Sequence, residues 1–258
     1  MLKPERELKI ISKLRSEGVV RLPELSTLIG TSENTIRRDL TRLESMGILR
    51  RTHGGAILND FDDQRSSEDT EWIARQKKFP LEKERIGRKA AELVHDGDAI
   101  VLDAGTTTMQ IARNLHAKRN ITVVTNAVNI GLEIVRSDSI TVLLTGGILR
   151  DISKSLVGPL NEEFLSGNMH VDWMFLSAGG VSIDGGITNA NTVEIPIKKA
   201  MIRASREVVL TVTHDKIGKR SFAPIASLDA ISTIITDADA DRELLKPLED
   251  RGIKIILV

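Results

Sequence analysis

From Asp98 to the C-terminus, short apolar runs alternate with stretches of helical periodicity, and this alternation restricts the possible folds more than any other feature. Seven apolar runs have the length of buried strands: 99–102, 121–124, 140–144, 173–176, 208–210, 231–235 and 253–257. Helical patterns separate them, for example over 107–115 and 127–135. Strands that alternate with helices predict a parallel sheet covered on both faces. We therefore expect an α/β domain over residues 81–258.

The first 58 residues follow a different pattern, in which glycines separate short helical segments. Apolar spacing predicts a helix over 4–16, a second helix opened by Pro23, and a third capped by Ser32 that ends near Met46. The second helix should turn Leu28 toward the core. Residues 19–22 could form a short strand, and residues 48–58 predict two short strands around a glycine turn. This order is typical of a winged helix-turn-helix domain, which we assign to residues 1–58.

The third helix offers side chains that suit base recognition. A stripe of Ile36, Leu40 and Leu43 should face the core. The opposite face and its flanks then carry Asn34, Thr35, Arg37, Arg38, Thr41, Arg42 and Ser45. Asparagine can bind adenine with two hydrogen bonds and arginine can bind guanine in the same way, from the N-terminal part of a recognition helix. A merely solvated, charged helix face is the alternative interpretation.

The predicted wing supports the DNA-binding interpretation. Arg50, Arg51 and His53 lie beside Gly54 and Gly55. A basic strand pair with a glycine tip can approach the phosphate backbone or the minor groove. Charge is distributed accordingly: residues 1–58 hold 11 Lys/Arg and 7 Asp/Glu, a balance of +4, and the remaining 25 and 29 give −4. A basic module on an acidic body is expected of a protein that contacts phosphates with one end.

Residues 59–80 are predicted to link the two domains. The stretch 59–71 is polar, mostly charged and without periodicity. A long helix should follow and end around Val94, with Pro80 either interrupting it or starting its main part. Because a single winged helix contacts few base pairs, we expect a homo-oligomer, a dimer or tetramer, on DNA. Residues 72–94 are our candidate for part of its interface.

A small-residue loop follows the first strand of the α/β domain. The sequence Asp103-Ala-Gly-Thr-Thr-Thr108 opens a helix, so backbone N–H groups and threonine hydroxyls gather at a helix N-terminus, where phosphate binds well. A capped helix with a tight turn is the alternative. Asn126, Gly147 and Lys216 come where later strands should end, and such ends line the ligand crevice of open α/β sheets. Neither a GxGxxG loop nor a P-loop is present, so nucleotide binding has no support.

At this point the motifs indicate a family. Thr35-Ile-Arg-Arg-Asp-Leu40, followed by Arg51-Thr-His-Gly-Gly-Ala56, resembles the DeoR-type bacterial regulators of sugar metabolism. The resemblance implies a helix-turn-helix over 20–39 and repression relieved by a phosphorylated sugar-pathway intermediate. Together with the helix and wing patterns, it makes the following residues the predicted DNA-binding set: Ser32, Asn34, Thr35, Arg37, Arg38, Arg42, Arg51, His53 and Gly54.

The same resemblance extends to the C-terminal part of the chain, whose family counterpart is similar in fold to ribose-5-phosphate isomerase and related sugar-phosphate enzymes. It implies that the effector is bound by Asp103, Gly105, Thr106, Thr107, Asn126, Gly147, Glu194 and Lys216. One position departs from the family pattern. An acidic residue usually precedes the lysine by three positions, but here Thr213 stands there and Asp215 directly precedes Lys216. The class of effector therefore stays open.

Composition excludes several other functions. The chain of 258 residues has no cysteine, so it has no disulfides, thiol catalysis or cysteine-bound metal, and we expect neither a metal nor a cofactor. No apolar run reaches the length of a membrane span and no signal peptide precedes the first helix, so we expect a cytoplasmic protein. Two alternatives remain open: a sugar-phosphate isomerase carrying a DNA-binding module, and a purely architectural DNA-binding protein.

Overall fold

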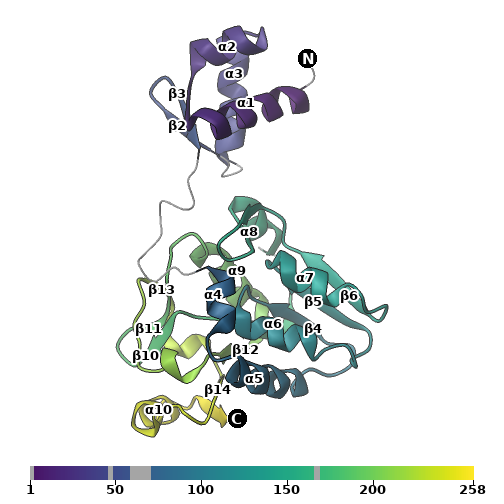
Figure 1. Cartoon of the computed structure of the whole chain (residues 1–258), viewed down its shortest axis with the longest axis vertical. Coiled ribbons are helices and arrows are strands. Elements are labelled where there is room, and N and C mark those ends of the chain that lie inside the picture. Colours follow the sequence, from purple (N-terminus) through teal and green to yellow (C-terminus); the bar gives the residue numbers. More distant parts are fainter. Residues whose placement is uncertain (1–2, 46–48, 59–70, 166–168) are drawn as a thin grey trace. The chain divides into compact units, whose positions relative to one another are not determined.

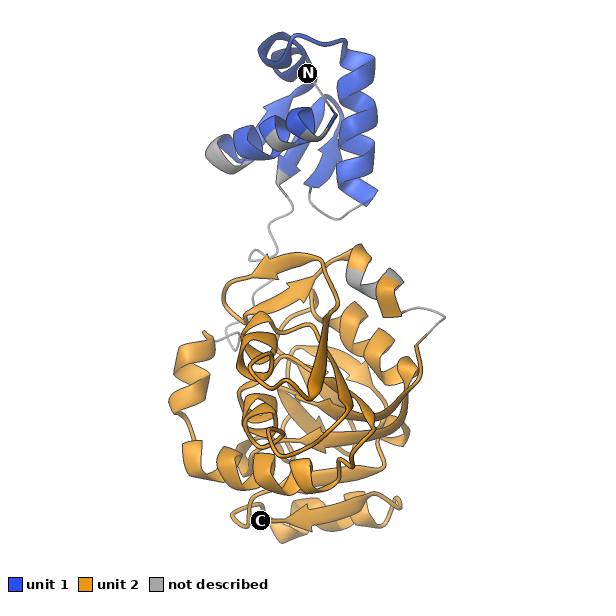
Figure 2. Ribbon diagram, turned by 90° about the vertical axis from the view of Figure 1, so that its right-hand side faces the viewer, with its two compact units in different colours: residues 1–63 blue, residues 64–258 orange. Residues whose placement is uncertain are grey.

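The computed structural model describes residues 3–45, 49–58, 71–165 and 169–258. The chain divides into two compact units, residues 1–63 and 64–258, coloured separately in Figure 2. Each unit has its own hydrophobic core.

Unit 1 combines three helices with a small antiparallel sheet (Figure 1). Its elements are α1 (Lys3–Glu17), β1 (Val19–Arg21), α2 (Leu22–Ile29), α3 (Glu33–Ser45), β2 (Leu49–Thr52) and β3 (Gly55–Leu58). The strands pair in the order β1-β3-β2, so the expected two-stranded wing gains β1 as a third strand. This architecture confirms the winged helix-turn-helix prediction.

The core of unit 1 is formed by apolar side chains from all three helices and all three strands. Ile36, Leu40 and Leu43 of α3 are buried there, as the helical spacing predicts. Leu28 was expected to face inward but is 55% exposed, because the short helix α2 turns only Leu22, Leu25 and Ile29 toward the core. The expected end of α3 near Met46 lies outside the described residues, as does Gly47.

A glycine is required where β1 passes β3. Gly55 pairs with Arg21, and a Cβ atom on Gly55 would lie 1.9 Å from the carbonyl oxygen of Val20. The neighbouring Gly54 has nothing within 4 Å of such an atom. The two adjacent glycines therefore differ in role: Gly55 permits the close approach of β1, whereas Gly54 lies in the turn with open space around it.

Unit 2 is built on a seven-stranded parallel sheet. The strands are β4 (Ala99–Leu102), β5 (Ile121–Thr125), β6 (Ile140–Leu144), β9 (Val171–Leu176), β12 (Ser205–Thr211), β14 (Thr233–Thr236) and β15 (Lys254–Leu257). Their order is β15-β14-β12-β9-β4-β5-β6, and each neighbouring pair is parallel. All seven predicted strands are present. The chain reverses its direction across the sheet between β4 and β9, which makes that pair the topological switch point.

Helices cover both faces of this sheet, as expected. The helices of unit 2 are α4 (Trp72–Lys77), α5 (Pro80–Glu92), α6 (Thr106–Arg113), α7 (Val128–Ile134), α8 (Pro159–Leu165), α9 (Ile195–Ala204) and α10 (Arg242–Glu249). Phe175 packs in one core with side chains of α5, α6 and α7, while Met174 and Leu176 pack in the other with α8, α9 and α10. Adjacent residues of a strand thus enter opposite cores, which explains the continuous apolar runs.

Two smaller antiparallel sheets were not predicted. One is the hairpin β7 (Ile148–Arg150) and β8 (Ser155–Val157), and the other joins β10 (Gly180–Ser182), β11 (Gly186–Asn189) and β13 (Ala223–Ala226). Both are made of three- and four-residue strands, too short for a period-two pattern to stand out. Short 3₁₀ helices lie before and after β13, at His214–Lys216 and Leu228–Ala230.

The C-terminal part of the expected linker is helical. Within 59–80, the residues Trp72–Lys77 form α4, and Pro80 is at the start of α5. Phe79, between the two helices, has a left-handed backbone with φ of 52°. Pro80 therefore starts the main helix rather than interrupting a continuous one, because a proline is tolerated in the first turn and disfavours helical backbone in the residue before it.

Candidate functional site

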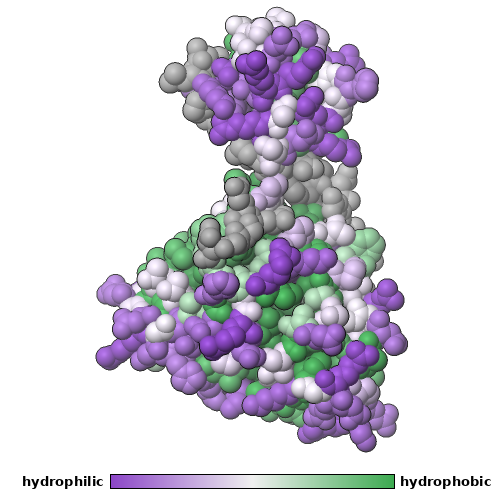
Figure 3. Space-filling model, turned by 180° about the vertical axis from the view of Figure 1, so that it is seen from behind, coloured by the Kyte–Doolittle hydropathy of each residue, from purple (hydrophilic) through white to green (hydrophobic). Residues whose placement is uncertain are grey.

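Helix α3 presents the predicted base-reading residues to solvent. The hydroxyl of Ser32 accepts a hydrogen bond from the backbone N–H of Thr35 at 3.3 Å, as the capping prediction requires. Asn34, Arg37 and Arg38 are exposed. The face of unit 1 visible in Figure 3 is largely hydrophilic. The N-terminal half of α3 thus leaves one amide and two guanidinium groups available to a partner.

Helix α3 is tied to α1 by an ion pair that sequence reasoning missed. Asp39 is 3% exposed, and its carboxylate accepts hydrogen bonds from two nitrogen atoms of Arg6, one of them at 3.1 Å. Arg42 lies on the same side, 3.3 Å from the carboxylate of Glu7. Arg42 therefore faces α1 in this structure rather than joining Arg37 and Arg38.

The wing is anchored to the C-terminal half of α3. The guanidinium of Arg51 donates to the hydroxyl of Thr41 at 2.8 Å, and the backbone N–H of Arg51 donates to Glu44 at 2.8 Å. His53 and Gly54 form the exposed turn between β2 and β3. Of the predicted wing residues, His53 and Gly54 are thus at the tip, while Arg51 connects the wing to the helix.

In unit 2, the switch point is held together by a buried ion pair. Asp103 follows β4 and Ser177 follows β9, and the Oδ2 atom of Asp103 accepts hydrogen bonds from the Ser177 N–H at 2.9 Å and hydroxyl at 2.6 Å. Lys198 of α9 donates to the same oxygen at 2.5 Å. Asp103 and Lys198 are 0% and 1% exposed. Asp103 was predicted to bind the effector, but it is buried and is not among the residues that line the cavity described next.

A cavity opens above this pair at the N-terminus of α6. The predicted residues Gly105, Thr106 and Thr107 line it, together with Ser177 and Lys216. Gly105 precedes α6, and a Cβ there would meet the Ser177 hydroxyl at 2.9 Å. The first backbone N–H groups of α6 are at this wall, where the helix dipole favours an anion. The hydroxyl of Thr108, in contrast, donates to backbone carbonyls of the loop and is 0% exposed.

Cationic side chains outnumber carboxylates around the cavity. Arg75, Lys78, Lys83, Lys216 and Lys219 line it, against Asp215 and Glu194. The first three come from α4, α5 and the residues between them, a part of the chain that sequence analysis assigned largely to a linker. The signal that could have found them is the concentration of basic residues in 75–83, close to the proline that starts α5.

Glu194 is a buried carboxylate that accepts hydrogen bonds. Burial would raise the pKa of its carboxyl, but the charge of Lys198, a hydrogen bond from Ser153 and the charges of Arg75 and Arg150 lower that pKa to about 2. The hydroxyl of Ser155 also donates to its carboxylate, at 2.9 Å. Glu194 therefore lines the cavity as an anion at neutral pH.

Two of the predicted effector-binding residues are not part of the cavity lining. Asn126 is 1% exposed, and its side-chain oxygen accepts the Ala104 N–H at 3.1 Å. Gly147 has a φ of 112°, and a Cβ there would lie 2.6 Å from the Val157 carbonyl oxygen. Neither residue lines the cavity. Both residues lie near strand ends, as predicted, where Asn126 bonds to the backbone and Gly147 permits the close approach of Val157.

Asp215 occupies the wall where the family pattern has its acid at position 213. Its carboxylate accepts hydrogen bonds from the Thr213 hydroxyl at 2.6 Å and from Lys78 at 2.7 Å, and Lys216 is 3.3 Å away. Burial would raise the pKa of Asp215, but these hydrogen bonds and the charges of the two lysines lower it to about 2. The cavity wall therefore still carries a carboxylate, but it belongs to Asp215, two positions after the place of the acid in the family pattern.

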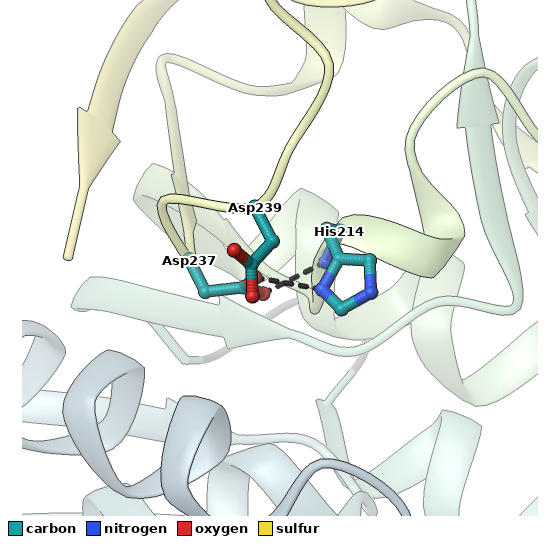
Figure 4. Close-up of side chains that lie close together, drawn as sticks. All are labelled: His214, Asp237 and Asp239. Carbon is teal, nitrogen blue, oxygen red and sulfur yellow. Dashed lines mark hydrogen bonds and ion pairs between the residues drawn. The ribbon is translucent and has the colours of Figure 1, made fainter.

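His214, Asp237 and Asp239 lie close together below this wall (Figure 4). Asp237 is 0% exposed, and its carboxylate accepts the backbone N–H of His214 at 2.8 Å and pairs with the imidazole Nδ1 at 2.7 Å. The ring of Phe79 packs edge-on against His214, with ring centroids 4.5 Å apart. Both carboxylate oxygens of Asp237 contact His214, one through the backbone N–H and one through the imidazole. Asp237 therefore fixes the start of the 3₁₀ helix that carries Lys216.

Known domain families and known proteins match both units of this chain. The DeoR-like helix-turn-helix domain matches residues 6–61, and the DeoR C-terminal sensor domain matches residues 78–238. The uncharacterized HTH-type transcriptional regulator YulB of Bacillus subtilis is 37% identical over 258 residues, covering 100% of this chain and 98% of that protein. The glycerol-3-phosphate regulon repressor of Escherichia coli is 32% identical over 257 residues, covering 100% of both chains.

Among solved structures, ribose 5-phosphate isomerase A of Methanocaldococcus jannaschii superposes with a TM-score of 0.39 and 16% identity, over 54% of this chain and 55% of that one. Within the described residues, no helix combines the length and apolar character needed to cross a membrane. The two domain matches cover both units, and the relatives match the chain from end to end. The chain therefore belongs to the DeoR family of transcriptional regulators.

Proposed function

We propose that this regulator represses a carbohydrate-utilisation operon and is controlled by a phosphorylated sugar or sugar acid bound in the cavity of unit 2. The observation that carries the proposal is the excess of cationic side chains around the N-terminus of α6 at the switch point. The relative in Escherichia coli is named a repressor of a glycerol-3-phosphate regulon, which supports a phosphorylated carbon source as effector.

The cavity suggests a role for each predicted side chain. A phosphate would accept hydrogen bonds from the N–H groups and hydroxyls of Thr106 and Thr107, and Lys216 would add charge. Glu194 would accept a hydrogen bond from a sugar hydroxyl. Asp103 and Asn126 would support these residues from below, since neither lines the cavity.

Replacing Thr106 and Thr107 together by alanine is expected to abolish the response to phosphorylated sugars. A ligand at 100 times its Kd stabilises the folded state by about 2.7 kcal/mol, so the wild type should melt at a higher temperature. Thermal unfolding of the full chain with a panel of triose, pentose and hexose phosphates measures this. The control Thr141→Ala changes an exposed threonine of β6. A normal response of the double variant would locate the phosphate elsewhere.

Replacing Arg38 by alanine is expected to weaken binding to the operator by about 1–3 kcal/mol, because a base-specific arginine contact is lost. Binding is measured on a duplex selected in vitro and on its scrambled version. The control is Lys9→Ala, which removes an exposed charge from α1. Equal losses on both duplexes would make Arg38 a phosphate contact, and no loss would refute its role.

The proposal has three further consequences, for turnover, effector response and oligomeric state. The regulator would not turn its effector over, so isomerisation of a sugar phosphate at enzymatic rates would favour the enzyme alternative. An architectural protein would show no effector response. A homo-oligomer would bind repeated half-sites, and a monomer in sedimentation on its operator would contradict this. In the candidate interface over 72–94, Ile73 and Leu81 are 56% and 63% exposed.

A further inference from the structure

Arg75 of helix α4 and Lys78, which directly follows that helix, add cationic groups to the cavity wall that the sequence did not lead us to expect. We infer that Arg75 and Lys78 bind the anionic group of the effector together with the N-terminus of α6, and that α4 thereby transmits occupancy of the cavity toward the DNA-binding unit. This inference rests on the proposed function. It adds two ligand-binding residues and names the element that responds to them.

Arg75 has a donor for which the described residues provide no partner. Its Nε atom is buried and makes no hydrogen bond there, although the side chain lines the cavity. A buried donor without an acceptor is costly. An anion within reach of Arg75 would remove that cost, and guanidinium groups bind phosphate oxygens well.

Lys78 is paired with a carboxylate that a phosphate could replace. Its ammonium group donates to Asp215 at 2.7 Å, and Asp215 also lies 3.3 Å from Lys216. One carboxylate thus serves two lysines at the cavity wall. A phosphate monoester carries about −1.5 to −2 charges and three acceptor oxygens, so it can attract both lysines while Asp215 retains the Thr213 hydroxyl.

Both ends of α4 are attached to residues that line the cavity or lie next to it. At its start, the Trp72 N–H donates to the Ile152 carbonyl at 2.8 Å, and the next residue, Ser153, lines the cavity. At its end, the Lys83 ammonium donates to the carbonyls of Arg75 and Lys78. Burial lowers the pKa of Lys83 to about 8 against the opposing charge of Asp215, so the group remains mostly protonated at neutral pH.

The junction after α4 has a strained backbone at Phe79. Phe79 is a non-glycine residue with φ of 52°, a conformation that costs about 1–3 kcal/mol and persists where packing enforces it. The ring contact with His214 provides that packing. Residues 59–70 connect α4 to the DNA-binding unit along the chain. A ligand that draws Arg75 and Lys78 inward would therefore act directly on the segment that leads there.

The test uses the full chain and inorganic phosphate as the probe, with chloride at matched ionic strength as the reference. In the Arg75→Met/Lys78→Met variant, calorimetry should show phosphate affinity at least tenfold weaker than in the wild type. Lys77→Met is the matched control, because Lys77 is an exposed residue of α4 that does not line the cavity. It should bind phosphate within twofold of the wild type. Lys78→Met alone, with a side chain that is 57% exposed, provides a variant whose folding is not at risk.

Hydrogen exchange and DNA binding test the transmission. Phosphate should slow amide exchange across 72–79 in the wild type and change its affinity for a selected duplex, and both effects should be lost in the double variant. Wild-type behaviour of the double variant in all three measurements would overturn the inference. If Thr106→Ala/Thr107→Ala loses phosphate binding while the α4 variant keeps it, only the role of α4 is refuted. If wild type binds no phosphate, both proposals fail.

Discussion

Lys198→Met is expected to lower the free energy of unfolding of unit 2 by about 3–5 kcal/mol, because it leaves the carboxylate of Asp103 buried without its counter-ion. Asp103 is 0% exposed and the Lys198 Nζ atom is 2.5 Å from its Oδ2. Ser177 would still donate two hydrogen bonds, but a neutral donor pair does not replace a buried positive charge. Since Ser177 lines the cavity, effector binding should weaken as well.

The measurement is urea unfolding of the full chain followed by tryptophan fluorescence. Both tryptophans, Trp72 and Trp173, belong to unit 2, so this signal reports on that unit alone. Lys199→Met removes the adjacent, exposed charge and should change stability little. Combining Lys198→Met with Asp103→Asn removes both charges of the pair and should recover part of the loss, because the buried carboxylate of Glu194 still lacks the charge of Lys198. A double variant as unstable as the single one would show that the missing counter-ion of Asp103 is not the cause.

Gly55→Ala is expected to destabilise unit 1 strongly and to weaken operator binding. The added methyl group would lie 1.9 Å from the Val20 carbonyl oxygen and 2.9 Å from the Cα of Arg21, and neither backbone atom can move without separating β1 from β3. Overpacking costs about 1–3 kcal/mol and sometimes more. A domain of this size has only about 3–9 kcal/mol of stability at 0.05–0.15 kcal/mol per residue.

Circular dichroism detects this loss as a helical transition that tryptophan fluorescence does not report. Gly54→Ala is the matched control, because Gly54 has open space around it and no positive φ. It should leave the melting temperature of unit 1 nearly unchanged. If the two variants melt alike, β1 does not approach β3 as closely as the structure indicates.

Much of the architecture was predictable because its causes are local. The strands of the large sheet are continuous apolar runs, since adjacent residues such as Met174 and Phe175 enter opposite cores. The outward face of α3 follows from helical periodicity, and Ser32 caps the helix as expected. The prediction that Leu28 faces the core was wrong. Helix α2 has only eight residues, so neighbouring elements decide which of its side chains are buried.

The candidate site was predictable in part, for the same reason. The sequence could place Thr106 and Thr107 at a helix N-terminus, because a small-residue loop directly after a strand typically leads into a helix. The sequence could not show that Asp103 turns into the floor, because its partner Lys198 is 95 residues away. The basic residues of 75–83 are visible in the sequence, but only the fold shows that Arg75 and Lys78 line this cavity.

Periodicity, glycine placement and composition therefore determined by themselves the two-domain organisation, the winged helix and the parallel strands. They also determined that polar side chains gather at strand ends. Only the tertiary structure decided the strand order, the switch point between β4 and β9, the burial of Asp103 and the place of α4 over the cavity. The physical reason is that helix and strand patterns depend on neighbours a few residues apart. The charge pairs and close approaches of the site join residues that only the packed fold brings together.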